Sequence, residues 1–175
     1  MKRFLTLILF CLLLTACGNT QPAETTVPTT LPPETTVPFT YAVPGEADMP
    51  NNDSLVNWGL TLKANKVQPT GCMLSYTQSG GAVTGELLTG TFFSIEFYNG
   101  QWTPATNLHP DMEINWNAVA FMIPTEGQTD YPEDWSFLHG PLTPGWYRIG
   151  KEVTDFRGPG DYDTAIFYAY FEITE

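Results

Sequence analysis

Three aspartates near the end of the chain come closest to a metal-binding pattern. Asp155, Asp161 and Asp163 lie in a stretch rich in Gly and Pro, and carboxylates are ligands that calcium prefers. Their spacing does not match the EF-hand loop, and Asp and Gly are also the residues that a hairpin loop needs for its own turns. Arg157 lies among them as a basic partner for one of these acids. We favour a structural loop, assign no metal ligand, and leave calcium binding open.

Other residue types that perform catalysis lack the spacing that catalysis requires. His109 and His139 are not in a zinc-binding motif, and the chain has no nucleophile elbow, phosphate-binding glycine loop or paired cysteine motif. Acidic residues are dense between Glu126 and Asp134. A small hydrolase that uses these carboxylates is the weakest function considered, because it needs two close acids with separated pKa values in a concave site. We predict a non-enzymatic protein with no catalytic residue and no cofactor.

The N-terminus carries a motif that is specific. Lys2 and Arg3 precede an apolar run, residues 4–14, that is too short to span a bilayer comfortably. It leads into Leu-Thr-Ala-Cys-Gly at residues 14–18, which resembles the lipobox of bacterial lipoproteins. The resemblance implies that residues 1–16 are a signal peptide and that Cys17 is the lipidation site, where acyl chains such as palmitate give stable anchoring. We expect this lipid to anchor the protein in the cell membrane, on its extracytoplasmic face.

The next segment has the composition of a linker. Residues 17–44 are rich in Thr, Pro and Glu, and Glu-Thr-Thr-Val-Pro occurs at residues 24–28 and again at 34–38. Such a segment favours polyproline II and buries too little apolar surface to offset its ordering entropy. We therefore predict a disordered linker, followed by one folded domain over residues 45–175.

The charge of the chain excludes one class of partner. Seven Lys and Arg against 19 Asp and Glu give a net charge of -12. A surface of this sign repels phosphate backbones, so we expect no nucleic-acid partner. Cationic and neutral partners remain open.

From residue 57 onward apolar and polar residues alternate, as they do in half-buried strands. Cys72 falls on the apolar side of its strand, which predicts a buried and inert thiol. Asn99-Gly100 predicts a tight hairpin, and the last strand places Ala165, Phe167, Ala169, Phe171 and Ile173 on one face. We count about seven to eight short strands and no helical period, which predicts an all-β antiparallel sandwich.

A Pro-Gly turn at residues 144–145 leads into the strand that begins Trp146-Tyr147. A tyrosine at such a corner packs inward while its hydroxyl returns to the backbone of the turn, which is a feature of immunoglobulin-like sandwiches. We expect Tyr147, Ile149 and Val153 to point inward.

Four further segments are assigned by the same criteria. Residues 79–90 and 155–163 are interpreted as loops, because Gly, Pro and Asp punctuate them. Residues 117–123 are interpreted as a strand with Val119, Phe121 and Ile123 on one face. Residues 126–135 are interpreted as an irregular acidic stretch.

The chain resembles a bacterial immunoglobulin-like domain found in surface lipoproteins of Firmicutes-type bacteria. The similarity covers about residues 55–175. The motifs that carry it are Thr70-Gly71, Tyr76 to Gly81, Thr84 to Leu87, Pro144 to Glu152 and Asp155 to Asp163. The resemblance implies an immunoglobulin-like sandwich outside the cell, and it brings no catalytic activity and no ligand.

Alternation along three strands points a set of aromatic side chains outward. In an immunoglobulin-like sandwich these strands are neighbours in one sheet, so we expect a candidate binding face. Its members are Tyr98, Trp146, Arg148, Tyr168 and Tyr170. Such residues are favoured in recognition surfaces, but outward aromatics also stabilise sheets by cross-strand pairing, and a loop can cover them.

Two functions for this face stay open. The leading hypothesis is a lipid-anchored cell-surface protein with a recognition or scaffold domain that takes a protein or cell-wall glycan ligand. The alternative is a carbohydrate or cell-wall binding module, because stacked aromatic rings suit sugar faces.

Overall fold

The computed structural model describes residues 40–51 and 53–174. The predicted signal peptide, Cys17 and most of the predicted linker lie outside the described residues. Among the described residues, no helix has the length and apolar character that crossing a membrane requires.

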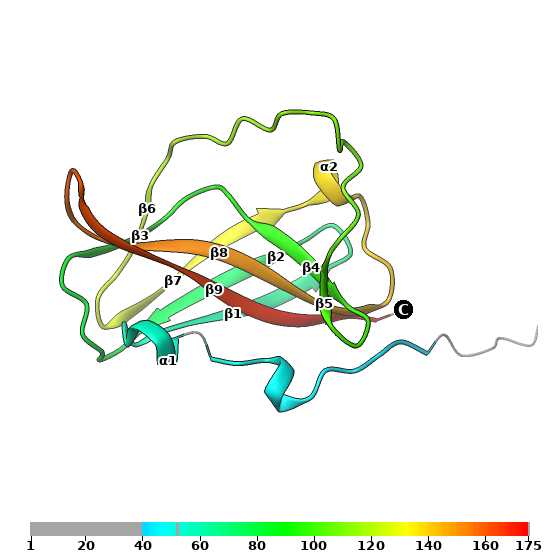
Figure 1. Ribbon diagram of the computed structural model, residues 1–175, viewed down its shortest axis with the longest axis horizontal. Coiled ribbons are helices and arrows are strands. Elements are labelled where there is room, and N and C mark those ends of the chain that lie inside the picture. Colours follow the sequence, from blue (N-terminus) through cyan, green and yellow to red (C-terminus); the bar gives the residue numbers. More distant parts are fainter. Residues whose placement is uncertain (1–39, 52, 175) are drawn as a thin grey trace, which may run out of the picture. The chain divides into compact units, whose positions relative to one another are not determined.

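The regular secondary structure of the described chain is almost entirely β strand (Figure 1). The strands are β1 Leu60–Gln68, β2 Gly71–Gln78, β3 Glu86–Thr89, β4 Ser94–Tyr98, β5 Trp102–Pro104, β6 Phe121–Ile123, β7 Gly127–Asp134, β8 Gly145–Gly158 and β9 Asp161–Ile173. One 3-10 turn (η1, Glu46–Asp48) and two single-turn helices (α1, Asp53–Val56; α2, Ser136–His139) complete the elements. The predicted all-β fold is confirmed, with nine strands in place of seven to eight.

The strands form two antiparallel sheets that pack as a sandwich. The smaller sheet has the order β1-β2-β7. The larger sheet is built on the long strand β8, which pairs with β9 on one side and with β4 and β3 end to end on the other. β5 extends the sheet beyond β4, and β6 extends it beyond β3. The candidate face therefore lies on one sheet, as predicted, because β4, β8 and β9 are neighbours.

The core lies between the sheets and follows the predicted alternation. Leu74 and Tyr76 of β2 and Ile149 and Val153 of β8 are fully buried. Cys72 is buried as well, and burial raises the pKa of its thiol to about 12, so it is a packing residue as predicted. The remaining buried aliphatic and aromatic side chains of the core include Trp58, Leu60, Ile95, Trp135, Phe167 and Phe171.

The predicted tyrosine corner is confirmed. Tyr147 is 4 % exposed and its hydroxyl donates to the carbonyl of Thr143 at 2.9 Å. Its ring packs against Phe97 and Phe171, with centroids 5.3 and 5.8 Å away. The corner therefore connects the turn before β8 to the inner faces of β4 and β9.

Several segment predictions were wrong. Residues 127–134, predicted irregular, form β7, which pairs with β2 over its whole length. The predicted loop 79–90 contains β3, and the predicted loop 155–163 is a tight hairpin in which β8 and β9 pair up to Gly158 and Asp161. Only residues 121–123 of the predicted strand 117–123 are β structure. Val119 lies before the strand and is 49 % exposed, whereas Ile123 is 2 % exposed.

Candidate functional site

The three aspartates considered as calcium ligands gather around a guanidinium. Arg157 Nε lies 2.8 Å from Asp161, Nη2 lies 3.0 Å from Asp163, and Nη1 lies 3.6 Å from Asp155. The described residues contain no group of three or more His, Cys, Asp or Glu side chains arranged to hold a metal ion. The geometry supports a hairpin held by internal ion pairs.

Asp155 has a structural role of its own in this hairpin. It is 2 % exposed and accepts hydrogen bonds from Thr84 N at 2.9 Å, Thr84 Oγ1 at 2.8 Å and Gly85 N at 2.6 Å. Burial opposes its ionisation, but these bonds and the charge of Arg157 outweigh it, and the pKa of Asp155 is lowered. The carboxylate thus fastens the start of β3 to the hairpin.

The acidic residues of β7 are divided between the two faces of a strand. Glu133 points into the sandwich, whereas Asp130 and Asp134 are exposed. Glu126, just before the strand, accepts from the backbone N of Gly80 at 2.7 Å and serves a turn. The alternation therefore places Glu133 on the opposite face of the strand from Asp130 and Asp134.

The two histidines lie in the region of α2. The ring of His109 stacks on Phe137 with centroids 4.5 Å apart. His139 donates from Nδ1 to the carbonyl of Thr106 at 2.8 Å. Each histidine ring therefore makes a contact that holds a neighbouring segment in place.

The structure brings the five residues of the candidate binding face onto the outer side of one sheet. Cross-strand partners place Arg148 opposite both Glu96 and Tyr170, and Trp146 opposite Glu172. The guanidinium of Arg148 lies 4.0 Å from the ring centroid of Tyr168, which is a cation–π contact, and its Nε donates to Glu96. Arg148 thus connects side chains of all three strands, β4, β8 and β9, across this face.

A fifth aromatic residue, Trp102 of β5, belongs to this face, although sequence reasoning did not include it. Its ring lies 5.0 Å from Tyr98, 5.6 Å from Tyr170 and 4.9 Å from the guanidinium of Arg148. A two-residue Asn99-Gly100 turn would pair Tyr98 with Gln101, whereas the structure pairs Tyr98 with Trp102 across residues 99–101. The Asn-Gly signal therefore predicted the hairpin but not the side of the sheet on which Trp102 lies.

Residues 41–50, which we call the strap, cover part of the aromatic face. Tyr98 donates to the Asp48 carboxylate at 2.9 Å, and Trp102 Nε1 donates to the Asp48 carbonyl at 2.6 Å. Tyr170 donates to the carbonyl of Pro50 at 3.2 Å, and Tyr41 donates to Glu172. As a result Tyr98 is only 7 % exposed, so much of the face serves internal packing.

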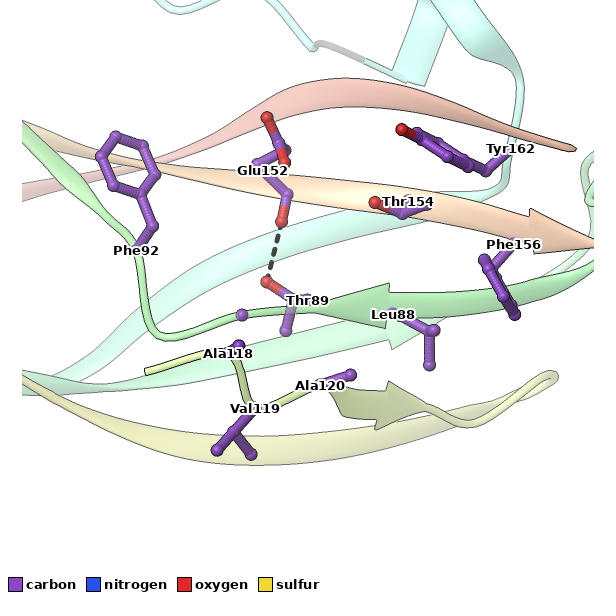
Figure 2. A pocket seen from close by; sticks show the side chains of 11 residues that line it. Leu88, Thr89, Phe92, Ala118, Val119, Ala120, Glu152, Thr154, Phe156 and Tyr162 are labelled. Carbon is purple, nitrogen blue, oxygen red and sulfur yellow. Dashed lines mark hydrogen bonds between the residues drawn. The ribbon is translucent and has the colours of Figure 1, made fainter. Parts of the chain in front are cut away.

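The other half of the same sheet face carries an open groove (Figure 2). It has a volume of about 350 Å³ and is lined mainly by apolar side chains. Phe92 and Tyr162 lie toward its two ends, with Glu152 and Thr154 of β8 between them. Phe92 is 46 % and Tyr162 is 54 % exposed. Sequence reasoning missed this groove, because two of its walls come from connections outside the strands.

A model of the bacterial Ig-like domain family matches residues 54–172. The chain belongs to this family. Neither a curated protein nor a solved structure matches the chain. The match covers the nine strands of the sandwich except the last residue of β9, and it begins after the strap.

The inside of this bacterial Ig-like domain holds an ion pair that sequence reasoning did not identify. Lys151 of β8 is 1 % exposed, and its Nζ lies 2.7 Å from Glu133 Oε1 and 2.9 Å from the carbonyl of Gly90. Burial raises the pKa of Glu133, and Lys151 opposes that rise. The signal for Lys151 was present, since Ile149 and Val153 face inward and residue 151 lies between them in alternation.

Proposed function

We propose that the chain is a non-enzymatic recognition domain, held at the cell surface by a lipid on Cys17, whose groove binds a basic, partly apolar segment of a protein partner. The observation that carries the proposal is the contrast between the two halves of one sheet face. The strap covers part of the aromatic half, whereas the groove half exposes large apolar side chains around a carboxylate.

Exposed apolar side chains that gather in one place favour a binding surface. Phe92, Val119 and Tyr162 all line the groove and are each about half exposed. Apolar and aromatic side chains of a partner would remove this surface from water, and aromatic anchors contribute strongly to recognition.

Charge favours a basic segment in the partner. Glu152 is the one Asp, Glu, Lys or Arg among the lining residues, and it forms no ion pair within the described part of the chain. The chain as a whole has a net charge of -12. A Lys or Arg in the partner would be attracted by this field and would pair with Glu152 in the groove.

The groove is tested by photo-crosslinking in intact cells. A photoreactive phenylalanine analogue at position 162 is expected to give a discrete adduct with one protein. Glu152→Lys should reduce that adduct at least tenfold. Glu86→Lys, which makes the same charge change on an exposed residue of β3 outside the groove, should leave it unchanged. If the analogue captures no discrete protein, or if both charge variants behave alike, the groove is not the partner site.

The anchor is tested separately from the groove. Cys17→Ala is expected to move the protein from the membrane fraction to the medium or soluble fraction and to abolish incorporation of labelled palmitate. Cys11→Ala, a matched cysteine change within the predicted signal peptide, should leave both readouts unchanged. Membrane retention of the Cys17→Ala protein would contradict the assignment of Cys17 as the lipidation site.

A further inference from the structure

A second hollow, which we call the inter-sheet cleft, opens between the sheets on the side of β7. It has a volume of about 500 Å³, which is within the range of small-molecule sites. It shares Thr89 and Gly90 with the groove of Figure 2 but otherwise has its own walls. The lining residues that matter here are Tyr76, Asn115, Trp116, Tyr131 and Glu133.

The floor of the cleft contains a polar atom without a partner. Tyr76 is fully buried, and its hydroxyl forms no hydrogen bond with any described residue. The nearby hydroxyl of Thr89 donates to the carbonyl of Glu152 at 2.9 Å, and it forms no hydrogen bond with the phenol. Burial and the charge of Glu133 keep the pKa of Tyr76 far above its ordinary value, so the phenol stays protonated. It is therefore a donor in need of an acceptor.

Glu133 supplies a hydrogen-bond acceptor on the same floor. Its Oε1 is held by Lys151 at 2.7 Å, whereas Oε2 accepts no hydrogen bond from a described residue. A carboxylate oxygen can accept further hydrogen bonds. The floor thus presents one free donor and one free acceptor.

Aromatic rings form the walls above this floor. Trp116 is fixed by edge-to-face contacts with Phe92 and Phe93, with centroids 5.4 and 5.3 Å away. Tyr131 contacts the ring of Tyr76 at 5.8 Å. Fixed rings beside a polar floor suit a ligand that has an apolar face and hydroxyl groups on its edge.

The charges restrict the ligand further. The charge of Glu133 is balanced by Lys151, so the floor carries no net charge. Asp134 at the cleft and the net charge of -12 disfavour an anion. A purely apolar ligand would leave the Tyr76 hydroxyl unpaired. We propose that the inter-sheet cleft binds one neutral sugar unit, with a ligand oxygen accepting from Tyr76, a ligand hydroxyl donating to Glu133, and the ring lying against Trp116.

The test is a titration of the purified full chain with glucose and N-acetylglucosamine, followed by tryptophan fluorescence and calorimetry. At least one of these sugars is expected to give a saturable signal. Tyr76→Phe, which removes only the unpaired oxygen, should weaken that binding at least tenfold. Tyr98→Phe is the matched control, because its hydroxyl bonds to the strap on the outer face, and it should bind as the original chain does. Asn115→Ala, an exposed change at the cleft, should weaken binding even if Tyr76→Phe folds poorly.

A charged sugar separates the proposed class from its neighbours. Glucuronate should bind at least tenfold more weakly than glucose, the matching neutral sugar. The proposal is overturned if neither neutral sugar binds, if Tyr76→Phe folds and binds undiminished, or if glucuronate binds equally well. A crystal structure grown with N-acetylglucosamine that holds only a water between Tyr76 and Glu133 would also overturn it.

Discussion

Two buried tyrosines of this domain differ in whether the hydroxyl has a partner. The hydroxyl of Tyr147 donates to Thr143 O at 2.9 Å, so we expect Tyr147→Phe to lower the free energy of unfolding by about 1 kcal/mol, the net value of a typical buried hydrogen bond. Urea denaturation measures the change. The carbonyl of Thr143 would then lose the bond that fixes the turn before β8.

Tyr76→Phe is the control for this substitution. Its hydroxyl has no partner among the described residues, so its removal should leave the free energy of unfolding unchanged or raise it by about 1 kcal/mol, because an unsatisfied buried hydroxyl costs free energy. If the two substitutions destabilise the domain equally, the Tyr76 hydroxyl is not unpaired in the folded protein.

The buried pair of Lys151 and Glu133 leads to a second prediction. Lys151→Met should lower the free energy of unfolding at pH 7 by about 3–5 kcal/mol, because it leaves the Glu133 carboxylate buried without its counter-charge. Adding Glu133→Leu should recover most of this loss. Failure of the double variant to recover would mean that Lys151 contributes mainly through its bond to Gly90.

The same variant should respond to pH in a defined direction. Burial raises the pKa of Glu133, and removing Lys151 takes away the charge that opposes the rise. A carboxyl with a raised folded pKa stabilises the fold fully below its unfolded pKa of about 4.3, and this contribution is lost as the pH rises through the folded pKa. Lys151→Met should therefore regain stability relative to the original chain between pH 7 and about pH 4.5. A constant difference across thermal melts at these pH values would contradict this.

Residues such as Cys72 and Tyr147 could be predicted from the sequence because each follows from period-two alternation or from one turn. Lys151 was equally available by alternation, since a long side chain at an inward position needs a partner. Its partner could not be found from the sequence, because Glu133 lies in β7, a strand without an apolar pattern. Which side chains meet between the two sheets depends on how the sheets pack, and the local sequence pattern does not contain this information.

At the scale of elements, Asp155 connects β3 to the β8–β9 hairpin, and its titration predicts acid sensitivity. Its hydrogen bonds outweigh the effect of burial and lower its pKa. A carboxyl with a lowered folded pKa contributes stability above its unfolded pKa of about 3.9 and loses it as the pH falls through the folded pKa. Asp155→Asn should therefore be less stable at pH 7 and should show a flatter decline in stability below about pH 4.

Thermal melts between pH 2 and 7 check this prediction. The control is Asp161→Asn, which removes another partner of Arg157 but one whose side chain is 68 % exposed. Exposed ion pairs contribute little, so this variant should follow the original chain. An unaltered pH profile in Asp155→Asn would show that the carboxylate does not bear the acid sensitivity.

The strands that sequence analysis missed share a physical cause. β7 contains Pro132 and several acids, which depress strand propensity, but it is the edge strand of the order β1-β2-β7, where proline and charge are tolerated. β3 has only four residues between glycine-rich turns. Both form because of the neighbouring strands with which they pair. β8 and β9 were predictable because each is long and its alternation of apolar and polar residues shows which side chains are buried.

At the scale of the whole molecule, the domain and the segment before it share one surface. The aromatic face was predictable from alternation and sheet order, but its cover was not. Tyr41 lies in the segment that its composition assigns to the linker, and yet it donates to Glu172. The strap therefore joins the N-terminal end of the described chain to the sheet that carries the groove.

A truncation tests whether the strap is an integral part of the fold. A chain that begins at residue 51 loses the bonds that Tyr98, Trp102 and Tyr170 make to the strap, whereas a chain that begins at residue 40 keeps them. We expect the shorter chain to melt roughly 5 °C lower, which corresponds to a loss of about 1–2 kcal/mol for a domain of this size. It should also bind an apolar dye that the longer chain does not.

Equal melting temperatures would show that the strap only lies on the sheet. A lower melting temperature would show that the strap contributes to the stability of the fold. The strap is also the first described segment between the predicted anchor and the sandwich, so tension applied at the N-terminal side would act on it first. The strap is held mainly by a few hydrogen bonds at its own residues, whereas β1 is paired along its length. The strap should then detach before any strand unfolds, and the aromatic face would be exposed while the groove and the inter-sheet cleft keep their shape.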